Sequence, residues 1–372
     1  MRVVHVHRIS GIGGSERHLL ALLPALRVHG VEATFVGLDD PRGDSEPFYA
    51  ALEHAGIPFA RVPASHDLDP RLPFRIAHAA RRLQPELVHT HLVHADVHGA
   101  AASVLLRLPL VSTKHNDDPF RAGPFRYVER LLARRARRIV AITESLARFN
   151  AERVGIPRAK LVVVHYGLDA PPARWADNPP LTLPEGGTRV LLALGRLVPQ
   201  KGLDVAVRAL PEVRRTHPDA VLVIAGEGPE RHALENLAAE LGVGDALFLP
   251  GRAGDVAALL ERAELLVHPS RWEGFGLVLL EAMLASVPVV ATRVSSIPEI
   301  VVDGETGVLV PAEDPQALAA ALVRVLDDPG TLGAAGRARA LEQFSADAMA
   351  RRTAAVYADA IRTTASAHDS TV

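Results

Sequence analysis

Cysteine is absent from this 372-residue chain, which excludes a disulfide framework, a thiolate metal site and a cysteine nucleophile. No apolar run approaches the roughly 20 residues needed to span a bilayer, and the first residues, MRVVHVH, read as a strand and not as a secretory signal. The formal net charge is −2, which argues against the broad positively charged surface that nucleic-acid binding requires. We therefore expect a cytoplasmic protein that neither spans a membrane nor binds nucleic acid.

The composition that remains is typical of a globular α/β protein. Hydrophobic residues make up 48% of the chain and charged residues 23%, and a length beyond about 250 to 300 residues favours two domains. Short β-branched runs alternate with Ala- and Leu-rich stretches, which predicts parallel strands buried on both faces in two doubly wound domains. The expected strands lie at 2–7, 32–38, 86–91, 109–115, 138–143, 161–167, 189–195, 220–226, 246–251, 264–270, 287–292 and 307–311.

A proline-rich stretch, 167–189, suits a connection between the two halves better than a helix or strand. We place the domain boundary there, with an N-terminal domain at 1–170 and a C-terminal domain at 171–344. Ligands of doubly wound sheets bind beyond the carboxyl ends of the strands. Two such domains facing each other therefore predict a cleft lined by two sets of loops.

The first strand is followed by the glycine-rich stretch SGIGGSERHLL, residues 10–20. Its glycines let the backbone approach a ligand, and we expect Ser15 to cap a helix that begins at Glu16, with free N–H groups that favour an anion. A simple turn is the other interpretation. The G-x-G-x-x-G spacing of a dinucleotide site is missing, so a nicotinamide-dependent dehydrogenase is poorly supported.

The stretch LGRLVPQKGLD, 194–204, brings two cations, Arg196 and Lys201, to one strand end beside the start of a helix. Such a pair can neutralise a diphosphate and stabilise the charge that develops as a bond to it breaks. The next two strands end in AGEGPE, 225–230, and PGR, 250–252. Backbone groups in these loops are candidates for contacting a nucleobase, and structural turns are the alternative.

Two carboxylates stand seven residues apart in HPSRWEGFGLVLLEAM, 268–283. Glu273 is expected in the loop after a buried strand, and Glu281 just over a turn into the next helix. Carboxylates accept hydrogen bonds from sugar hydroxyls, so one glutamate suits a ribose and the other a hexose. Alternatively, Glu273 is a charge favoured by a helix start and Glu281 a solvated helical residue.

The motifs G-G-S-E-R, G-R-x-x-x-x-K-G, G-E-G-P, P-G-R and E-G-F-G-L-x-x-x-E-A-M follow one another in this order. With them, almost the whole chain resembles the family 4 (group 1) retaining glycosyltransferases of the GT-B fold. The resemblance implies two Rossmann-like domains facing across a cleft. It also implies that a final helix, about 345–365, joins the N-terminal domain.

Site residues follow from the same resemblance. Arg196 and Lys201 would bind the diphosphate of a nucleotide sugar, Glu281 its ribose and Glu273 the transferred sugar. The catalytic residues would be His115, Glu273, Arg196 and Lys201, and Ser15 and His91 would contact the acceptor. The full implied donor site is Gly13, Gly14, Arg196, Lys201, Gly226, Glu227, Arg252, Glu273, Gly274, Phe275, Gly276, Leu277 and Glu281.

The implied reaction is front-face transfer with retention of anomeric configuration, in which the leaving phosphate accepts the proton of the acceptor hydroxyl. Fixed cations would take the place of a metal, and no cofactor is expected besides the nucleotide-diphospho-sugar. Acceptors left open are a lipid-linked saccharide, a polysaccharide intermediate and a small metabolite. Alternatives of the same fold are a nucleotide-sugar epimerase and a phosphorolytic enzyme, and a non-catalytic sugar-binding module is another.

Three residues depart from the family pattern. Tyr166 stands where relatives commonly have asparagine, and Ser295 and Ser296 replace a common glycine pair. Tyr166 is expected to alter the hinge or the floor of the cleft. The two serines are expected to change how the donor is contacted, so the identity of the donor is not carried over from the family.

Four histidines, His89, His91, His94 and His98, lie in HTHLVHADVH at spacings that zinc permits. Satisfied structural histidines are the commoner outcome, and we expect no metal site.

The stretch RAGPFRYVERLLARRARR, 121–138, holds seven arginines and one glutamate. At helical spacing it presents a possible basic stripe for anionic lipid, and a solvated helix face is the alternative. The arginines of the expected stripe are Arg126, Arg130, Arg134, Arg137 and Arg138.

Overall fold

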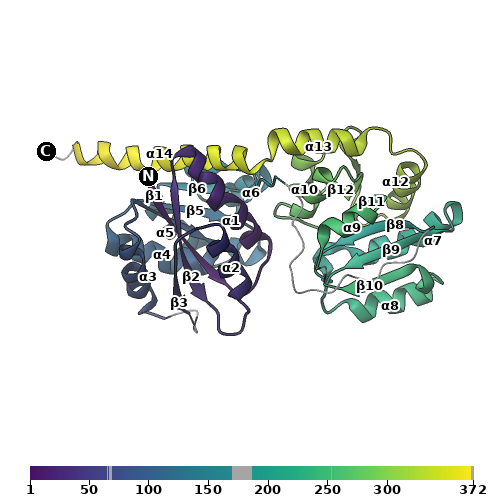
Figure 1. Cartoon of the computed structure of the whole chain (residues 1–372), viewed down its shortest axis with the longest axis horizontal. Helices are drawn as coiled ribbons and strands as arrows, with labels where there is room; N and C mark the ends of the chain where they lie inside the picture. The colour runs from purple at the N-terminus through teal and green to yellow at the C-terminus, as the bar shows by residue number, and fades with distance from the viewer. Residues whose placement is uncertain (65, 67–68, 170–186, 253, 370–372) are drawn as a thin grey trace. The chain divides into compact units, whose positions relative to one another are not determined.

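The computed structural model describes residues 1–64, 66, 69–169, 187–252 and 254–369, and side chains through Arg362 (Figure 1). The described residues form two compact units. Unit 1 comprises Met1–Gly167 and Ser345–Val372, and unit 2 comprises Leu168–Phe344. Each unit has its own parallel sheet with helices between successive strands, which confirms the predicted pair of doubly wound α/β domains. Most of the predicted connection at 167–189 lies outside the described residues.

The seven-stranded sheet of unit 1 has the order β3-β2-β1-β4-β5-β6-β7, with every pairing parallel. Its strands are β1 (Arg2–Ile9), β2 (Glu32–Asp39), β3 (Phe59–Pro63), β4 (Leu87–His91), β5 (Leu110–Lys114), β6 (Arg138–Ala141) and β7 (Leu161–Val163). The helices of the unit are α1 (Gly14–Ala25), α2 (Glu46–His54), α3 (Leu72–Arg82), α4 (Leu92–Leu106), α5 (Arg126–Arg135), α6 (Glu144–Phe149) and α14 (Ala346–Asp369).

Alternation along the strands divides unit 1 into two hydrophobic cores. On one face Val3, Phe35 and Val111 pack with apolar side chains of α1, α2 and α14. On the other face Val4 and Val6 pack with side chains of α3, α4 and α5. Because successive side chains of a strand point to opposite faces, the odd-numbered residues of β1 all face α1 and α14.

Helix α14 returns the end of the chain to unit 1, where it runs beside α1 (Figure 1). Its apolar residues Met349, Val356, Tyr357 and Ala360 are buried in the first core. At its surface Arg138 of β6 pairs with Asp359 at 2.6 Å. Among the described residues, no helix combines the length and the hydropathy needed to cross a membrane.

The six-stranded sheet of unit 2 has the order β10-β9-β8-β11-β12-β13, again with parallel pairings. Its strands are β8 (Arg189–Leu194), β9 (Ala220–Ala225), β10 (Leu247–Gly251), β11 (Leu265–His268), β12 (Val289–Thr292) and β13 (Val308–Val310). The helices are α7 (Leu203–Thr216), α8 (Arg231–Glu240), α9 (Val256–Arg262), α10 (Leu277–Leu284), α11 (Ile297–Ile300), α12 (Pro315–Asp327) and α13 (Leu332–Gln343).

All the predicted strands are present, and one observed strand, β3, was not expected from the sequence. Its run FARVP includes Arg61 and Pro63, and β3 pairs with β2 alone, at the edge of the sheet. An edge strand tolerates proline and partial exposure because one side of its backbone has no partner strand. It therefore lacks the continuous β-branched pattern of the buried strands.

Candidate active site

The predicted donor motifs of unit 2 lie in loops at one edge of its sheet. Strand β8 is flanked by β9 on one side and β11 on the other, so the winding of the chain changes direction between β8 and β11. The carboxyl ends of these parallel strands meet at that edge. A doubly wound sheet binds its ligands at such a switch point.

Lys201 and Glu273 come from the two loops beside the switch point and form an ion pair between Lys201 Nζ and Glu273 Oε1. Nε2 of His268 donates to the same carboxylate oxygen at 3.1 Å, and Oγ of Ser270 donates to it at 3.1 Å. The Glu273 side chain is only 7% exposed. Three groups, from the loop after β8, from β11 and from the loop after β11, thus converge on one buried carboxylate.

The charge of Glu273 is stabilised by these neighbours. Burial by itself would raise the pKa of the Glu273 carboxyl. The hydrogen bond from His268 and the charge of Lys201 outweigh burial and hold that pKa at about 2. Glu273 is therefore an anion at neutral pH.

A second set of contacts fixes the loop between Glu273 and α10. The buried Oγ of Ser296 donates to the carbonyl oxygens of Glu273 and Phe275, at 3.1 and 3.3 Å. Gly276 precedes α10 with φ at +89°, a left-handed conformation that favours glycine. One of the two serines that depart from the family pattern therefore tethers this loop.

The loops of β8 and β11 also contact each other through their backbones. Gly202 has φ at +59°, and a Cβ there would lie 2.2 Å from the carbonyl oxygen of Pro269. Arg271 N donates to Gln200 O at 2.8 Å, and its guanidinium pairs with Asp204 at 3.0 Å. The arrangement holds Lys201 next to Glu273.

Glu281 is the fifth residue of α10 and is fully buried, although its neighbours Leu279, Leu280 and Ala282 are apolar. The interpretation of Glu281 as a solvated helical residue is therefore wrong. A buried carboxylate is costly unless it is used or compensated. Phe275 and Leu277 are also buried, so in these two residues only the backbone is suited to contact a ligand.

The remaining predicted donor residues of unit 2 lie at the neighbouring strand ends. Arg196 after β8 and Arg252 after β10 are exposed, and neither side chain has a hydrogen bond or ion pair to any residue that the structure describes. Gly226 approaches the β8 loop so closely that a Cβ would lie 1.8 Å from Gly195 O. Glu227 pairs with Arg231 at 3.3 Å.

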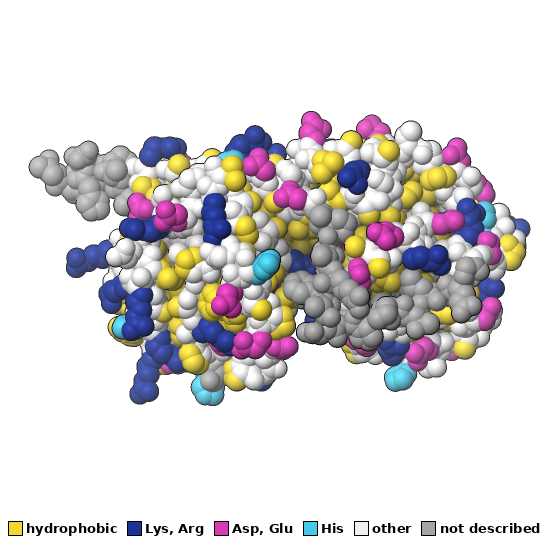
Figure 2. Space-filling model, viewed as in Figure 1, with side chains coloured by type: hydrophobic (Ala, Val, Ile, Leu, Met, Phe, Trp, Pro, Cys, Tyr) yellow, Lys and Arg dark blue, Asp and Glu magenta, His cyan; other side chains and the backbone are white. Residues whose placement is uncertain are grey.

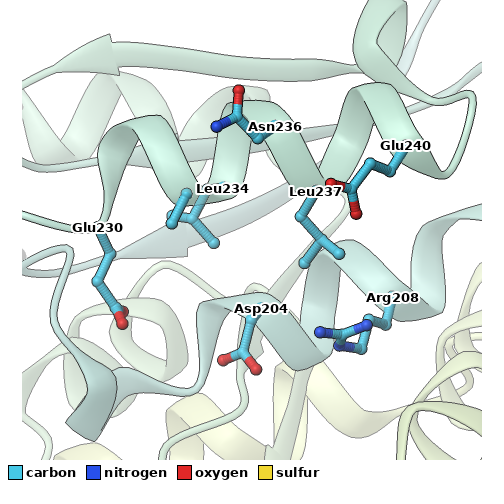
Figure 3. A pocket seen from close by; sticks show the side chains of 8 residues that line it. Asp204, Arg208, Glu230, Leu234, Asn236, Leu237 and Glu240 are labelled. Atoms are coloured by element: carbon cyan, nitrogen blue, oxygen red, sulfur yellow. The ribbon is translucent and has the colours of Figure 1, made fainter.

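A groove of about 240 Å³ lies between α7 and α8 (Figure 3). Asp204 and Arg208 of α7 line it on one side, and Leu234, Leu237 and Glu240 of α8 on the other. It includes none of the predicted donor residues.

Unit 1 contains a cluster of buried histidines that sequence reasoning identified only in part. His5 and His7 of β1 and His89 and His91 of β4 lie on the face of the sheet that α1 and α14 cover, and His5 pairs in register with His89. His115 directly follows β5. The alternating HVH and HTH patterns were the available signal, because period two puts both histidines of each pair on one face.

Both ring nitrogens of His115 are engaged. Nδ1 is hydrogen-bonded to the hydroxyl of Tyr166, and Nε2 lies 3.1 Å from Nδ1 of His91. Tyr166, the departure from the family pattern that was expected at the hinge, is buried and also stacks on His18 at 4.2 Å between ring centroids. Burial lowers the pKa of the His115 imidazole well below its usual value, so the ring is neutral.

Glu16 links β1 to the start of α1. Its carboxylate accepts a hydrogen bond from Nε2 of His7 at 2.9 Å, from Gly13 N at 2.9 Å and from Ser15 Oγ at 3.0 Å. Burial raises the pKa of the Glu16 carboxyl, but its contacts with His7 and with the backbone N–H groups leave it below the usual value.

The predicted cap of α1 is wrong in detail. The helix begins at Gly14 with Gly13 as its N-cap, and Ser15 is inside the helix, where its hydroxyl donates to Glu16. Gly13 N is already used by Glu16, whereas Gly14 is exposed at the helix start.

A buried network of ion pairs includes Lys114, the residue that directly precedes His115. Lys114 Nζ donates to Asp96 at 2.5 Å and to Glu129 at 2.8 Å, and Arg121 pairs with Glu129 at 2.7 Å. All four side chains are almost fully buried. The network joins β5, α4 and α5 to the segment that follows His115.

Arg121 is therefore not part of an exposed basic surface, and the predicted arginine stripe needs correction. Helix α5 ends at Arg135, so Arg137 and Arg138 do not continue its helical spacing, and Arg138 starts β6. On α5 the exposed side chains include Arg130 and Arg134, together with the apolar Tyr127 and Leu131.

The predicted histidines do not come together as one ligand set. His94 contacts His98 on α4, with tilted rings whose centroids are 4.9 Å apart. Among the described residues, His5, His89 and His91 are the histidines with nitrogen atoms close enough to share a metal. Each of these rings uses both nitrogens in hydrogen bonds within the cluster.

Two family models match the chain, "Glycosyltransferase Family 4" over residues 12–170 and "Glycosyl transferases group 1" over residues 177–343. The glycogen synthase of Mycobacterium tuberculosis H37Rv is 35% identical over 299 residues, which is 76% of this chain and 70% of the relative. The chain belongs to glycosyltransferase family 4. It is thus an enzyme of glycosyl transfer.

Another relative of this glycosyltransferase has a different name. The D-inositol 3-phosphate glycosyltransferase of Thermobispora bispora is 37% identical over 61% of this chain and 56% of its own length.

Among solved structures, Anabaena HepE in complex with UDP and glucose superposes with a TM-score of 0.80 at 22% identity, covering 96% of this chain and 99% of HepE. A glycosyltransferase from Rickettsia africae gives 0.78 at 18% identity, over 97% and 98% of the two chains. These similarities confirm the GT-B fold.

Proposed function

We propose that this glycosyltransferase transfers a sugar from a nucleotide-diphospho-sugar to an acceptor hydroxyl, with retention of configuration and without a metal. The observation that carries the proposal is the switch point of unit 2. There the cation Lys201 and the buried anion Glu273 form an ion pair beside the ends of β8 and β11, and the exposed Arg196 follows β8. Unit 2 is the donor unit in this account, and unit 1 the acceptor unit.

The donor roles follow from charge and position. Arg196 and Lys201 neutralise the diphosphate, both before and while the bond to the sugar breaks. Glu273 and the backbone of the loop from Gly274 to Leu277 hold the transferred sugar and its phosphate, and Glu281 accepts from the ribose. Gly226, Glu227 and Arg252 line the nucleobase end, and Gly13 and Gly14 of unit 1 approach the diphosphate.

The chemical step needs charge stabilisation more than a strong base. The anomeric carbon gains positive charge as the diphosphate leaves, and the leaving phosphate accepts the proton of the incoming hydroxyl. Fixed cations stabilise that state as a metal would. His115 contacts the donor sugar, and Ser15 and His91 lie on the acceptor side. The neutral state of His115 is consistent with a positioning contact.

The acceptor is proposed to be a lipid-linked saccharide, a polysaccharide intermediate or a small metabolite. A Mycolicibacterium smegmatis relative described as a GDP-mannose-dependent phosphatidylinositol monomannoside mannosyltransferase is 40% identical over 43% of this chain and 45% of its own length. HepE binds UDP-glucose in another of its crystal structures. These relatives make uridine and guanosine the first nucleotides to test.

Peripheral contact with anionic lipid is part of the proposal. Tyr127 and Leu131 of α5 are 61% and 64% exposed, beside Arg130 and Arg134. On the face drawn in Figure 2, lysine and arginine side chains also project from the left end of unit 1. Exposed aromatic and aliphatic side chains next to arginines fit a negatively charged bilayer surface.

The test is release of nucleoside diphosphate from UDP-, GDP- and ADP-sugars in EDTA, first without and then with candidate acceptors. We expect slow release from one donor, an increase with the right acceptor, and loss of both in His115→Ala. NMR of the product would show the anomeric configuration of the donor. An inverted product would contradict retention, and dependence on added metal would contradict the proposed role of the two cations.

A further inference from the structure

Four histidines of unit 1 form a continuous line of hydrogen bonds that crosses three strands and passes through a tyrosine of α14. From Tyr166 the line passes to His115 Nδ1, and from His115 Nε2 to His91 Nδ1 at 3.1 Å. His91 Nε2 lies 3.0 Å from His5 Nδ1. The hydroxyl of Tyr357 on α14 is 3.3 Å from His5 Nε2 and continues the line.

The far end of the line is inside the sheet. Tyr357 is 2.7 Å from Nδ1 of His89, and Nε2 of His89 is 2.7 Å from the hydroxyl of Thr113. All four rings are buried, so no bulk water competes for their nitrogens. Burial lowers the pKa of His5 to about 3 and the pKa values of His89 and His91 well below their usual values. Each ring is therefore a neutral imidazole.

Neutral imidazoles impose a strict rule on this line. Each ring has one N–H donor and one bare nitrogen acceptor. The rings are joined head to tail, Nδ1 of one to Nε2 of the next or through the Tyr357 hydroxyl. If one of His5, His91 and His115 carries its proton on Nε2, the other two must do so, and the same holds for Nδ1. His89 shares that tautomer when the Tyr357 hydroxyl accepts from one of its two histidine neighbours and donates to the other.

We propose that Tyr166, His91, His5 and Tyr357 are positioning residues for His115, and that the line holds four histidines, His5, His89, His91 and His115, in one shared tautomer. This inference rests on the proposed role of His115 at the donor sugar. It assigns a function to Tyr166, which replaces the asparagine common in the family. It also gives α14 a part in the active site of unit 1.

A metal bound by His5, His89 and His91 is the competing use of the same rings. Such an ion would need ring nitrogens that are already engaged in the line, either as acceptors or as N–H donors. Every nitrogen of these three rings has a hydrogen-bond partner in the line, so the line explains the cluster without an ion.

The experiment is long-range ¹H–¹⁵N NMR of protein labelled at histidine, with signals assigned by single histidine variants. We expect His5, His89, His91 and His115 to show the same neutral tautomer at pH 7. Tyr357→Phe removes the hydroxyl that couples His5 to His89. It should change the tautomer populations of His115, which is three hydrogen bonds away from Tyr357. Thr353→Val is the matched control, because it removes a buried hydroxyl of α14 whose hydrogen-bond partner among the described residues is Met349 O.

Activity supplies an independent readout. Tyr166→Phe and Tyr357→Phe should lower kcat about 10-fold or more, because a displaced His115 misplaces the sugar. The proposal is overturned if wild-type His5 and His115 occupy different tautomers, if Tyr357→Phe and Tyr166→Phe both leave the His115 signals unchanged, or if added zinc shifts the cluster. Unimpaired His115→Ala would instead overturn the role of His115 in transfer and leave the shared tautomer standing.

Discussion

Glu273 couples the stability of unit 2 to pH. Its pKa is about 2 in the folded protein, against an ordinary value of 4.5. A carboxyl whose folded pKa is depressed stabilises the fold fully above its unfolded pKa, and that contribution is lost as the pH falls toward the folded pKa. Its ion pair with Lys201 is therefore expected to weaken between about pH 5 and pH 2.

We predict that Glu273→Gln lowers the free energy of unfolding by on the order of 3 kcal/mol at pH 7, and by much less at pH 3. Urea unfolding at the two pH values measures the difference. Glu261→Gln, at an exposed position of α9, is the control and should change little at either pH. Equal losses at pH 7 and pH 3 would mean that the depressed pKa of Glu273 does not contribute to stability.

Glu281 likewise allows a prediction about a single residue, here a kinetic one. If it accepts from the donor ribose in both the ground and transition states, Glu281→Gln should raise KM for the donor about 10-fold and change kcat little. Steady-state kinetics with saturating acceptor separates the two parameters. A loss confined to kcat would place Glu281 in the chemical step and not in ribose binding.

At the scale of helices and strands, the contacts between β5 and its neighbouring helices determine how firmly His115 is held. The network of Lys114, Asp96, Glu129 and Arg121 ties β5 to α4 and α5, directly beside His115. Removing one member leaves a buried charge without its partner, which costs roughly 3 to 5 kcal/mol.

Lys114→Met is accordingly expected to lower the free energy of unfolding of unit 1 by about that amount. Arg134→Met, an exposed cation on α5, should have little effect. Hydrogen exchange of β5 and α5 amides reports on unit 1 separately from unit 2. Unchanged exchange in Lys114→Met would show that the network is not needed to hold these elements.

The accuracy of the sequence predictions also varies with the type of element. Buried strands were predictable because β-branched runs such as AVLVIA are needed on both faces of a parallel sheet. The edge strand β3 carries no such run. The cap of α1 was misassigned because Glu16 bonds back to Gly13 from within the helix. The arginine stripe was misassigned because α5 ends before Arg137.

The loops that carry Lys201 and Glu273 could be placed at strand ends from the sequence, whereas the histidine line could not. Tyr357 reaches His5 across 352 positions of sequence, and no local pattern signals that contact. Period two in HVH and HTH indicates only that the histidines share faces of their own strands. That β1 and β4 are neighbours is a property of the sheet order, which the fold determines.

At the scale of the whole molecule, α14 makes unit 1 depend on the end of the chain. Met349, Val356, Tyr357 and Ala360 are buried in the core of unit 1, although they follow all of unit 2 in sequence. We predict that a chain ending at Phe344 loses on the order of 5 kcal/mol of stability in unit 1. Hydrogen exchange should show faster exchange in β1 and α1 and little change in β8 and β9. Equal loss of protection in both units would contradict this.

The central claim is that the β8 and β11 edge of unit 2 binds a nucleoside diphosphate, and equilibrium binding of UDP, GDP and ADP in EDTA tests it most directly. We expect one of the three to bind the wild type, and to bind Arg196→Met and Lys201→Met at least about 10-fold more weakly, since each loses a cation on the diphosphate. Arg208→Met, an exposed arginine in the groove between α7 and α8, should bind as the wild type does. Binding that is absent for all three nucleotides, or unaffected by Arg196→Met and Lys201→Met, would contradict the account.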